Sequence, residues 1–154
     1  MVKVNWNRVV LGGFIWVVVF NVLWLSSWHL FLRSEWISAM AALGRTFPET
    51  LGGLALWLAL MFFAGTFAIW LYAVLSRALA GTAPRNGILV TYGPGARTAA
   101  GVGVLLWLFI GLGPMLWNAH IFGLPTQTVT STLAVDFVAV VVATIVGAWP
   151  YKEE

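Results

Sequence analysis

The strongest constraint on this chain is a series of four long apolar stretches with few charged side chains. They run from 8 to 32, from 50 to 78, from 97 to 122 and from 126 to 149. A helix rises about 1.5 Å per residue, so roughly 20 residues cross the ~30 Å hydrocarbon core of a bilayer. Backbone groups in lipid must be hydrogen-bonded within their own segment, so each stretch is expected to be helical. The sequence therefore predicts an all-α, four-helix transmembrane bundle with up-down-up-down topology, a single membrane domain over residues 1–154.

Composition points to the lipid bilayer as the main partner of the chain. Of its 154 residues, 61% are hydrophobic and 8% are charged, too few polar side chains to cover a soluble domain. We expect no nucleic-acid partner. The chain has no cysteine, which excludes disulfides, thiolate nucleophiles and cysteine-ligated metal sites. Several of its ten tryptophans lie near the ends of the apolar stretches, as is typical of anchors in the headgroup region.

The distribution of basic residues predicts the orientation of the helices, because cytoplasmic loops are enriched in Lys and Arg. One side of the membrane would carry Lys3, Arg8, Arg77, Arg85, Arg97 and Lys152, and the other side Arg33 and Arg45. We therefore expect a multi-pass protein with both termini in the cytoplasm. The cytoplasmic loop at 79–96 would be a small hairpin edge or irregular structure. The first apolar stretch is longer than the core of a signal peptide, so it is expected to be a retained helix.

The loop after the first stretch has a pattern of its own. In residues 34–44, apolar side chains recur at helical spacing, beginning with Trp36. Ser34 is a candidate N-cap and Gly44 a candidate C-cap. This pattern predicts a short amphipathic helix that lies on the outer face of the membrane.

Small residues mark the faces on which membrane helices approach each other. The fourth stretch carries Ala139, Ala143 and Gly147 at successive four-residue steps, and Thr132 and Asp136 share that face. The third stretch carries Gly103 and Gly111 close to one face. We expect all these residues to face the interior of the bundle.

Asp136 is the unusual residue of the fourth stretch, because a carboxylate at mid-membrane depth costs roughly 2.5 to 3.5 kcal/mol. Helical rise places Asn21 at a similar depth and Asn118 nearer the outer surface. With Thr132, these residues are expected to form an intramembrane polar cluster open to the outer half. Asp136 is then interpreted either as a hydrogen-bonded clamp between helices or as a proton or cation site.

Two histidines, His29 and His120, lie at the outer ends of their stretches. Paired imidazoles from facing helices can ligate a haem or a chlorophyll, whereas single histidines at this depth commonly bond to headgroups or loop carbonyls. Neither histidine lies in a metalloprotease motif, and no serine lies in a nucleophile elbow. No metal site and no catalytic residue are therefore expected, and tetrapyrrole is the one cofactor with a possible ligand pair.

Five short segments carry a resemblance: "VNWNRVVLGG", "EWISAMAALG", "AIWLYAVLSR", "YGPGARTA" and "GAWPYKE". Together they resemble a family of small, uncharacterised four-helix bacterial inner-membrane proteins. The resemblance runs nearly end to end and implies a whole four-helix protein in a bacterial inner membrane. It implies no catalytic residue, ligand or partner.

These observations favour a structural, accessory or assembly role without enzymatic activity, as a homo-oligomer or as part of a larger membrane complex. The first alternative is a small proton- or cation-coupled transporter that uses Asp136. The second is a haem- or chlorophyll-binding subunit that uses His29 and His120.

Overall fold

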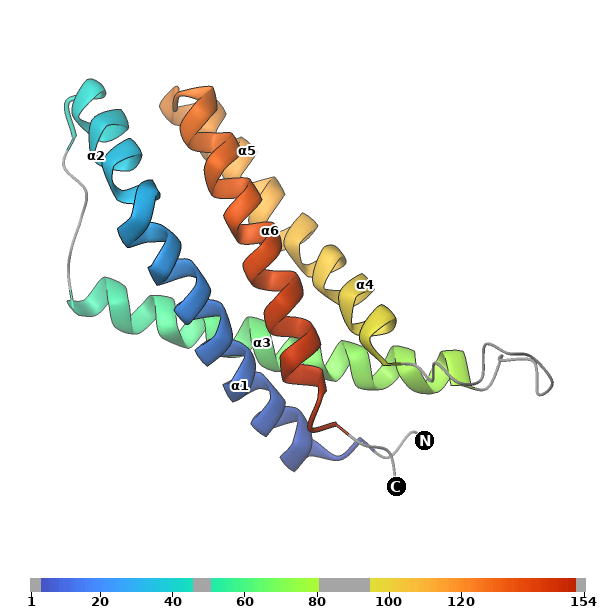
Figure 1. Ribbon diagram of the computed structural model, residues 1–154. Helices are drawn as coiled ribbons and strands as arrows, with labels where there is room; N and C mark the ends of the chain where they lie inside the picture. The colour runs from blue at the N-terminus through green and yellow to red at the C-terminus, as the bar shows by residue number, and fades with distance from the viewer. Residues whose placement is uncertain (1–3, 46–50, 81–94, 152–154) are drawn as a thin grey trace.

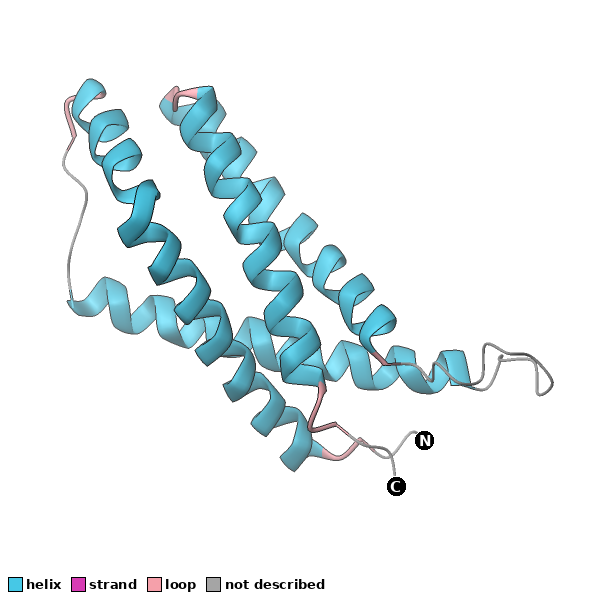
Figure 2. Ribbon diagram, in the orientation of Figure 1, coloured by secondary structure: helices cyan, strands magenta, loops and turns pink. Residues whose placement is uncertain are grey.

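The computed structural model describes residues 4–45, 51–80 and 95–151, and within these ranges the chain is helical with no strand (Figure 2). The predicted hairpin edge in the loop at 79–96 lies almost wholly outside the described residues. The elements are α1 (Trp6–Ser27), a π-helical turn (Trp28–Leu32), α2 (Arg33–Ala42), α3 (Leu51–Ala80), α4 (Ala96–Trp107), a second π-helical turn (Leu108–Leu112), α5 (Gly113–Phe122) and α6 (Thr126–Ala148). They make up four helices long and apolar enough to span a membrane, which confirms the predicted all-α membrane fold.

The first helix is much longer than predicted. It continues without interruption from Trp6 to Ala42 through the first π-helical turn, so α2 extends α1 along the same line (Figure 1). The prediction of a separate helix lying on the membrane surface is therefore wrong. Residues 28–34 contain neither proline nor glycine, and a wider turn absorbs one extra residue instead of ending the helix.

The predicted caps of the outer segment have different outcomes. Ser34 does not cap a helix, because its hydroxyl donates to the carbonyl oxygen of Phe31 in the preceding turn. Gly44 does end α2, with a φ of 67° that suits glycine. The N–H of Arg45 donates to the carbonyl of Met40 and that of Gly44 to the carbonyl of Ala41, the two bonds of a Schellman motif.

The four spanning helices are not all aligned. In Figure 1, α1, α6 and the α4–α5 helix run side by side, while α3, drawn in green, crosses them at a steep angle. At 30 residues α3 would be about 45 Å long, which exceeds the ~30 Å hydrocarbon core and requires a tilt in the membrane. The start of α1 and the end of α6 lie at the same end of the bundle.

Glycines set the closest helix approaches, where α1 passes between α3 and α6. A Cβ atom at Gly12 would lie 2.5 Å from the carbonyl oxygen of Gly147, and one at Gly13 would lie 2.8 Å from the Cα of Thr66. A Cβ at Gly65 would in turn lie 3.0 Å from the carbonyl oxygen of Gly13. Any side chain at these positions would force the helix backbones apart, so glycine here determines the packing distance.

Most of the predicted packing residues face a neighbouring helix. Ala139, Ala143 and Gly147 are buried on α6, and a Cβ at Gly103 of α4 would lie 2.9 Å from the Cα of Val141 on α6. Gly111 is the exception: it makes room for the Trp107 ring of its own helix, one turn earlier. Gly111 is buried in the second π-helical turn, and its predicted role in packing between helices stays a prediction.

Candidate functional site: a polar seam between the first and last helices

Three tryptophans of the first long helix donate indole N–H groups to three acceptors on α6, and we call this line of contacts the polar seam. Trp16 donates to Thr144 at 3.0 Å, Trp24 to Asp136 at 3.1 Å and Trp36 to Thr132 at 3.0 Å. The pairs follow each other in opposite order along the two helices, as antiparallel packing requires. The seam therefore joins α1 and α2 to α6 over much of their length.

The Trp16–Thr144 pair is the most enclosed part of the seam. Both side chains are fully buried, and the hydroxyl of Thr144 donates to the carbonyl of Val140 at 2.7 Å while it accepts from Trp16. Every polar atom of the pair is thus hydrogen-bonded. In a low-dielectric interior such a pair is costly to break, because the remaining partner would be left unpaired.

Asp136 lies at the middle of the seam and is partly buried. Within the described residues its carboxylate accepts one hydrogen bond, from Trp24, and no lysine or arginine pairs with it. The interior position predicted for Asp136 is confirmed. Its partner, however, is an indole rather than the Asn or Thr side chain that the sequence suggested.

An aromatic stripe explains how the donors are positioned. Trp16, Phe20, Trp24 and Trp28 follow at four-residue intervals on one face of the first helix. The rings of Trp16 and Phe20 stack at 4.9 Å, and those of Trp24 and Trp28 at 5.3 Å. Trp57 of α3 lies against the stripe, 5.6 Å from the Trp24 ring. These tryptophans pack inside the bundle, and the four-residue spacing of Trp16 and Trp24 was the signal that could have identified them as packing residues.

The four residues of the predicted polar cluster do not meet. Thr132 and Asp136 belong to the seam, but Asn21 faces α3, where its side-chain oxygen accepts from Trp57 at 3.4 Å. The Asn21 amide nitrogen also donates to the carbonyl of Val17. Asn118 is exposed on α5. Depth along a helix can be counted from sequence, but the direction in which a residue faces depends on how the helices are rotated.

His29 and His120 are both exposed on the helix surfaces. Neither reaches the interior of the bundle, where a tetrapyrrole between two helices would be bound. Among residues 4–45, 51–80 and 95–151, no three His, Asp or Glu side chains lie close enough to hold a metal ion.

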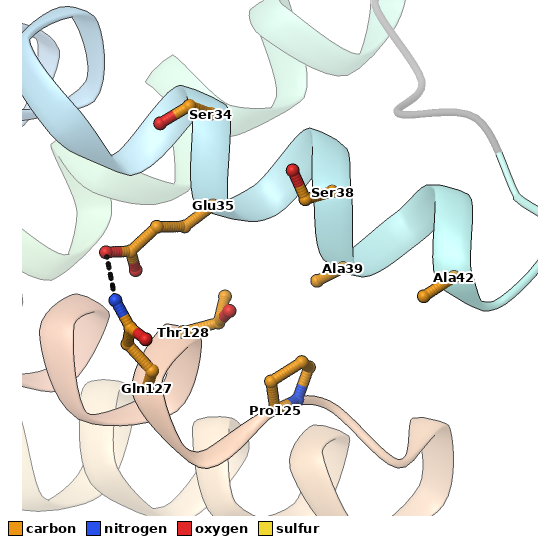
Figure 3. A pocket seen from close by; sticks show the side chains of 8 residues that line it. All are labelled: Ser34, Glu35, Ser38, Ala39, Ala42, Pro125, Gln127 and Thr128. Atoms are coloured by element: carbon orange, nitrogen blue, oxygen red, sulfur yellow. Dashed lines mark hydrogen bonds between the residues drawn. The ribbon is translucent and has the colours of Figure 1, made fainter.

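A further polar contact lies beyond the Trp36 end of the seam. Glu35 of α2 accepts from the hydroxyl of Ser131 at 2.6 Å and from the amide of Gln127 at 3.3 Å, both on α6. Figure 3 shows Glu35 reaching across from α2 toward Gln127 beside a cavity of about 370 Å³. The polar residues of its lining are Ser34, Glu35, Ser38, Gln127 and Thr128. Sequence reasoning missed this contact, because it placed Glu35 on a separate surface helix.

Comparisons of the chain with family models, with curated proteins and with solved structures give no match. The seam has to be interpreted from its chemistry. It consists of neutral indole and hydroxyl groups and the carboxylate of Asp136. The carboxylate of Glu35 lies beyond its end, and both carboxylates are bonded to neutral donors. This arrangement can hold two helices in one register and rotation, as interhelical hydrogen bonds do in membranes.

Proposed function

We propose that this protein is a non-enzymatic membrane protein that acts through helix assembly, as a homo-oligomer or as an accessory subunit of a larger membrane complex. The observation that carries the proposal is the first half of α3. From Leu51 to Leu60 every residue except Trp57 is exposed, so this part of a spanning helix packs against little of its own bundle. Trp57 alone reaches back to the aromatic stripe of α1.

The outward face of this half-helix has the composition of a helix-packing surface. Gly52, Ala55 and Ala59 recur at three- and four-residue spacing, and a Cβ at Gly52 would meet no atom within 4 Å. Small residues at this spacing let a second helix approach closely. Inside the bundle the chain already packs its helices in this way, at Gly12 and Gly147. The same chemistry on an uncovered face favours a second spanning helix as the partner.

The polar seam supports the same proposal. A protein that presents one helix face to a partner needs the rest of its bundle to be rigid, and the seam joins α6 to the first helix at Thr144, Asp136 and Thr132. In this interpretation Asp136 is an internal clamp. It orients helices rather than taking part in a reaction.

Single-cysteine cross-linking in native membranes tests the proposal, because the natural chain contains no cysteine. Ala59→Cys would carry a thiol-specific photo-cross-linker on the small-residue face. The adjacent Leu58→Cys is the matched control, at the same depth but about 100° away around the helix. We expect a discrete cross-linked protein adduct from Ala59→Cys and little adduct from Leu58→Cys. Mass spectrometry of the adduct would identify the partner as a second copy of this chain or as another subunit. Equal capture of lipid alone at both positions would contradict the proposal.

We further propose a bacterial inner membrane as the location, with both termini in the cytoplasm. The location is supported by the resemblance to bacterial inner-membrane proteins, and the orientation by the excess of basic residues on one side. Labelling of single cysteines in intact cells with a membrane-impermeant thiol reagent tests the orientation. Gly44→Cys should react from outside, whereas Gly95→Cys should react only after the membrane is opened.

A proton- or cation-coupled transport role for Asp136 is the second candidate. It is favoured by the partly buried carboxylate, which pairs with the Trp24 indole rather than with a cation. Flux assays in liposomes with wild type and Asp136→Asn test this role. Loss of a pH-driven flux in the variant would support transport, and no flux from wild type would remove the candidate.

A further inference from the structure

The cavity of about 370 Å³ beside Glu35 lies between α2 and the first turn of α6, and we call it the α2–α6 cavity (Figure 3). These elements belong to the membrane spans Trp6–Ala42 and Thr126–Ala148, so the cavity lies where both spans end. In a membrane such a position is at headgroup level. No described residue of α3 lines the cavity, so a ligand here is independent of the assembly face proposed above.

One side chain in the cavity wall is buried without a hydrogen-bond partner. Thr128 is 3% exposed, and although its backbone carbonyl accepts from Thr132, its own hydroxyl makes no hydrogen bond in the described part of the chain. The buried hydroxyls of Thr132 and Thr144 each donate to the carbonyl one turn earlier. For Thr128 the corresponding residue is Leu124, which precedes the start of α6 at Thr126. Buried hydroxyls are nearly always hydrogen-bonded, so this one indicates a missing partner.

The Thr128 hydroxyl faces the cavity. Figure 3 shows its side chain turned from α6 toward α2, with the hydroxyl oxygen directed at the space between Ala39 and Pro125, which also line the cavity. The unpaired hydroxyls of Thr66 and Tyr151 are different, because they are completely enclosed by the surrounding protein. Thr128 can therefore bond to a ligand in the cavity without any rearrangement.

Glu35 brings a negative charge to the same cavity. It is half-buried, and its carboxylate accepts from the Ser131 hydroxyl and the Gln127 amide, which are both neutral. Among the described residues no Lys or Arg lines the cavity. Arg45, just beyond the end of α2, lies instead over the ring of Phe122, 4.9 Å from its centroid. The charge of Glu35 therefore favours a ligand that is a cation.

The acceptor oxygens of the cavity suit a primary ammonium group. Because the amide nitrogen of Gln127 donates to Glu35, its carbonyl oxygen is turned the other way, toward Thr128 (Figure 3). The cavity thus offers a carboxylate, an amide oxygen and a hydroxyl, and an ammonium group has three N–H donors to match them. A calcium ion would need roughly six to eight oxygen ligands, more than these side chains supply.

We propose that the α2–α6 cavity binds a primary ammonium group, with Glu35 as its counter-charge and Gln127 and Thr128 as further acceptors. The source of the ammonium group is the ethanolamine headgroup of a phospholipid or a free amine. The position at headgroup level favours the lipid. The start of α6 favours it too: its first backbone bond runs from Val129 to Pro125, and the unpaired N–H groups of that turn suit the phosphate of the same headgroup.

The test measures thermal unfolding of the full chain in a neutral detergent, titrated with phosphatidylethanolamine or with phosphatidylcholine of the same acyl chains. The two headgroups carry the same charges, but the choline ammonium has no N–H donor. We expect phosphatidylethanolamine to raise Tm saturably and phosphatidylcholine to have little effect. Equal shifts by both lipids, or no saturable shift by phosphatidylethanolamine, would overturn the proposal.

Thr128→Val tests the site at the unpaired hydroxyl. The variant keeps the shape of the side chain and loses no hydrogen bond, so its Tm without lipid should equal that of wild type. Its apparent affinity for phosphatidylethanolamine should fall about tenfold, or about 1.4 kcal/mol. Thr130→Val, at an exposed position two residues along α6, is the matched control and should bind the lipid as wild type does. Undiminished affinity in Thr128→Val would refute the assignment of this cavity.

Glu35→Gln tests the counter-charge separately. Its amide oxygen can still accept from Ser131, so the fold should be retained while the negative charge is lost. We expect a larger loss of affinity than in Thr128→Val, because hydrogen bonds between two charged groups are the stronger ones; affinity equal to wild type would overturn the proposal. Ethanolamine separates the two sources. Displacement of the lipid at millimolar concentration identifies a site for the amine itself, and no displacement identifies the lipid as the ligand.

Discussion

The contact between Gly12 and Gly147 makes the sharpest prediction about stability. A methyl group at residue 12 would lie 2.5 Å from the carbonyl oxygen of Gly147 and 3.0 Å from a side-chain carbon of Ile69. To reach the 3.4 Å of an ordinary contact, α1 and α6 would have to separate by about 0.9 Å at this point. The obstacle is a backbone atom, so no rotation of a side chain can relieve it.

Gly12→Ala should therefore destabilise the protein by about 1 to 3 kcal/mol, the usual range for overpacking a close contact. A gap of about 0.5 to 1 Å removes a quarter to a half of each dispersion contact along the interface. The same separation would lengthen the neighbouring hydrogen bond from Trp16 to Thr144, which is 3.0 Å long. The better helix propensity of alanine, worth up to about 1 kcal/mol, offsets part of the loss.

Reversible unfolding in mixed detergent micelles, followed by circular dichroism, measures the effect. Gly101→Ala is the matched control, because Gly101 is also a helical glycine but a Cβ there would meet no atom within 4 Å. It should leave stability unchanged or raise it by up to about 1 kcal/mol. If Gly12→Ala proves as stable as Gly101→Ala, the packing of α1 against α6 at these glycines is not as described, and the reasoning fails.

Three further predictions concern the polar residues. Thr144→Val should lower the free energy of unfolding by about 1 to 3 kcal/mol, because it leaves the buried Trp16 indole unpaired. In a double-mutant cycle with Trp16→Phe, the two losses of stability should be strongly coupled. Losses that simply add would argue against the hydrogen bond. Asp136→Asn should retain stability, since an amide oxygen can still accept from Trp24. Asp136→Ala should lose about 0.6 to 1.7 kcal/mol of unfolding free energy. Equal losses for the two variants, measured by unfolding in detergent, would count against a clamp. Asn118→Leu should leave Tm unchanged, because the Asn118 side chain is exposed. A clear fall in Tm would mean that Asn118 makes a stabilising contact, contrary to its exposed position.

Residues 34–44 show which helix ends local sequence rules predict and which they do not. Gly44 was correctly identified as a helix end, because the left-handed conformation there is a local property of glycine. Ser34 was wrongly taken as a helix start, because a capping residue works only where the preceding chain is not helical. Whether the helix ends before Ser34 depends on the packing of α2 against α6, through contacts such as Trp36 with Thr132.

For the polar residues too, local sequence predicted some features and only the packing of the helices decided others. Asp136 and Thr132 were correctly placed on the interior face of α6, because the small residues Ala139 and Ala143 mark that face. Their partners were not foreseen. Tryptophan was expected at the membrane surface, and no local rule indicates that the indole N–H of Trp24 meets a carboxylate 112 residues away in the chain.

What the sequence alone determined is the number of spanning helices and nearly all of their limits. A long apolar stretch in lipid has no alternative to the helix, since no water is present to pair its backbone groups. The tertiary structure decided how each helix is rotated, where α3 crosses, and that α1 continues into α2. Those choices depend on contacts between distant residues, such as Gly12 with Gly147 and Trp16 with Thr144, which exist only once the helices have packed.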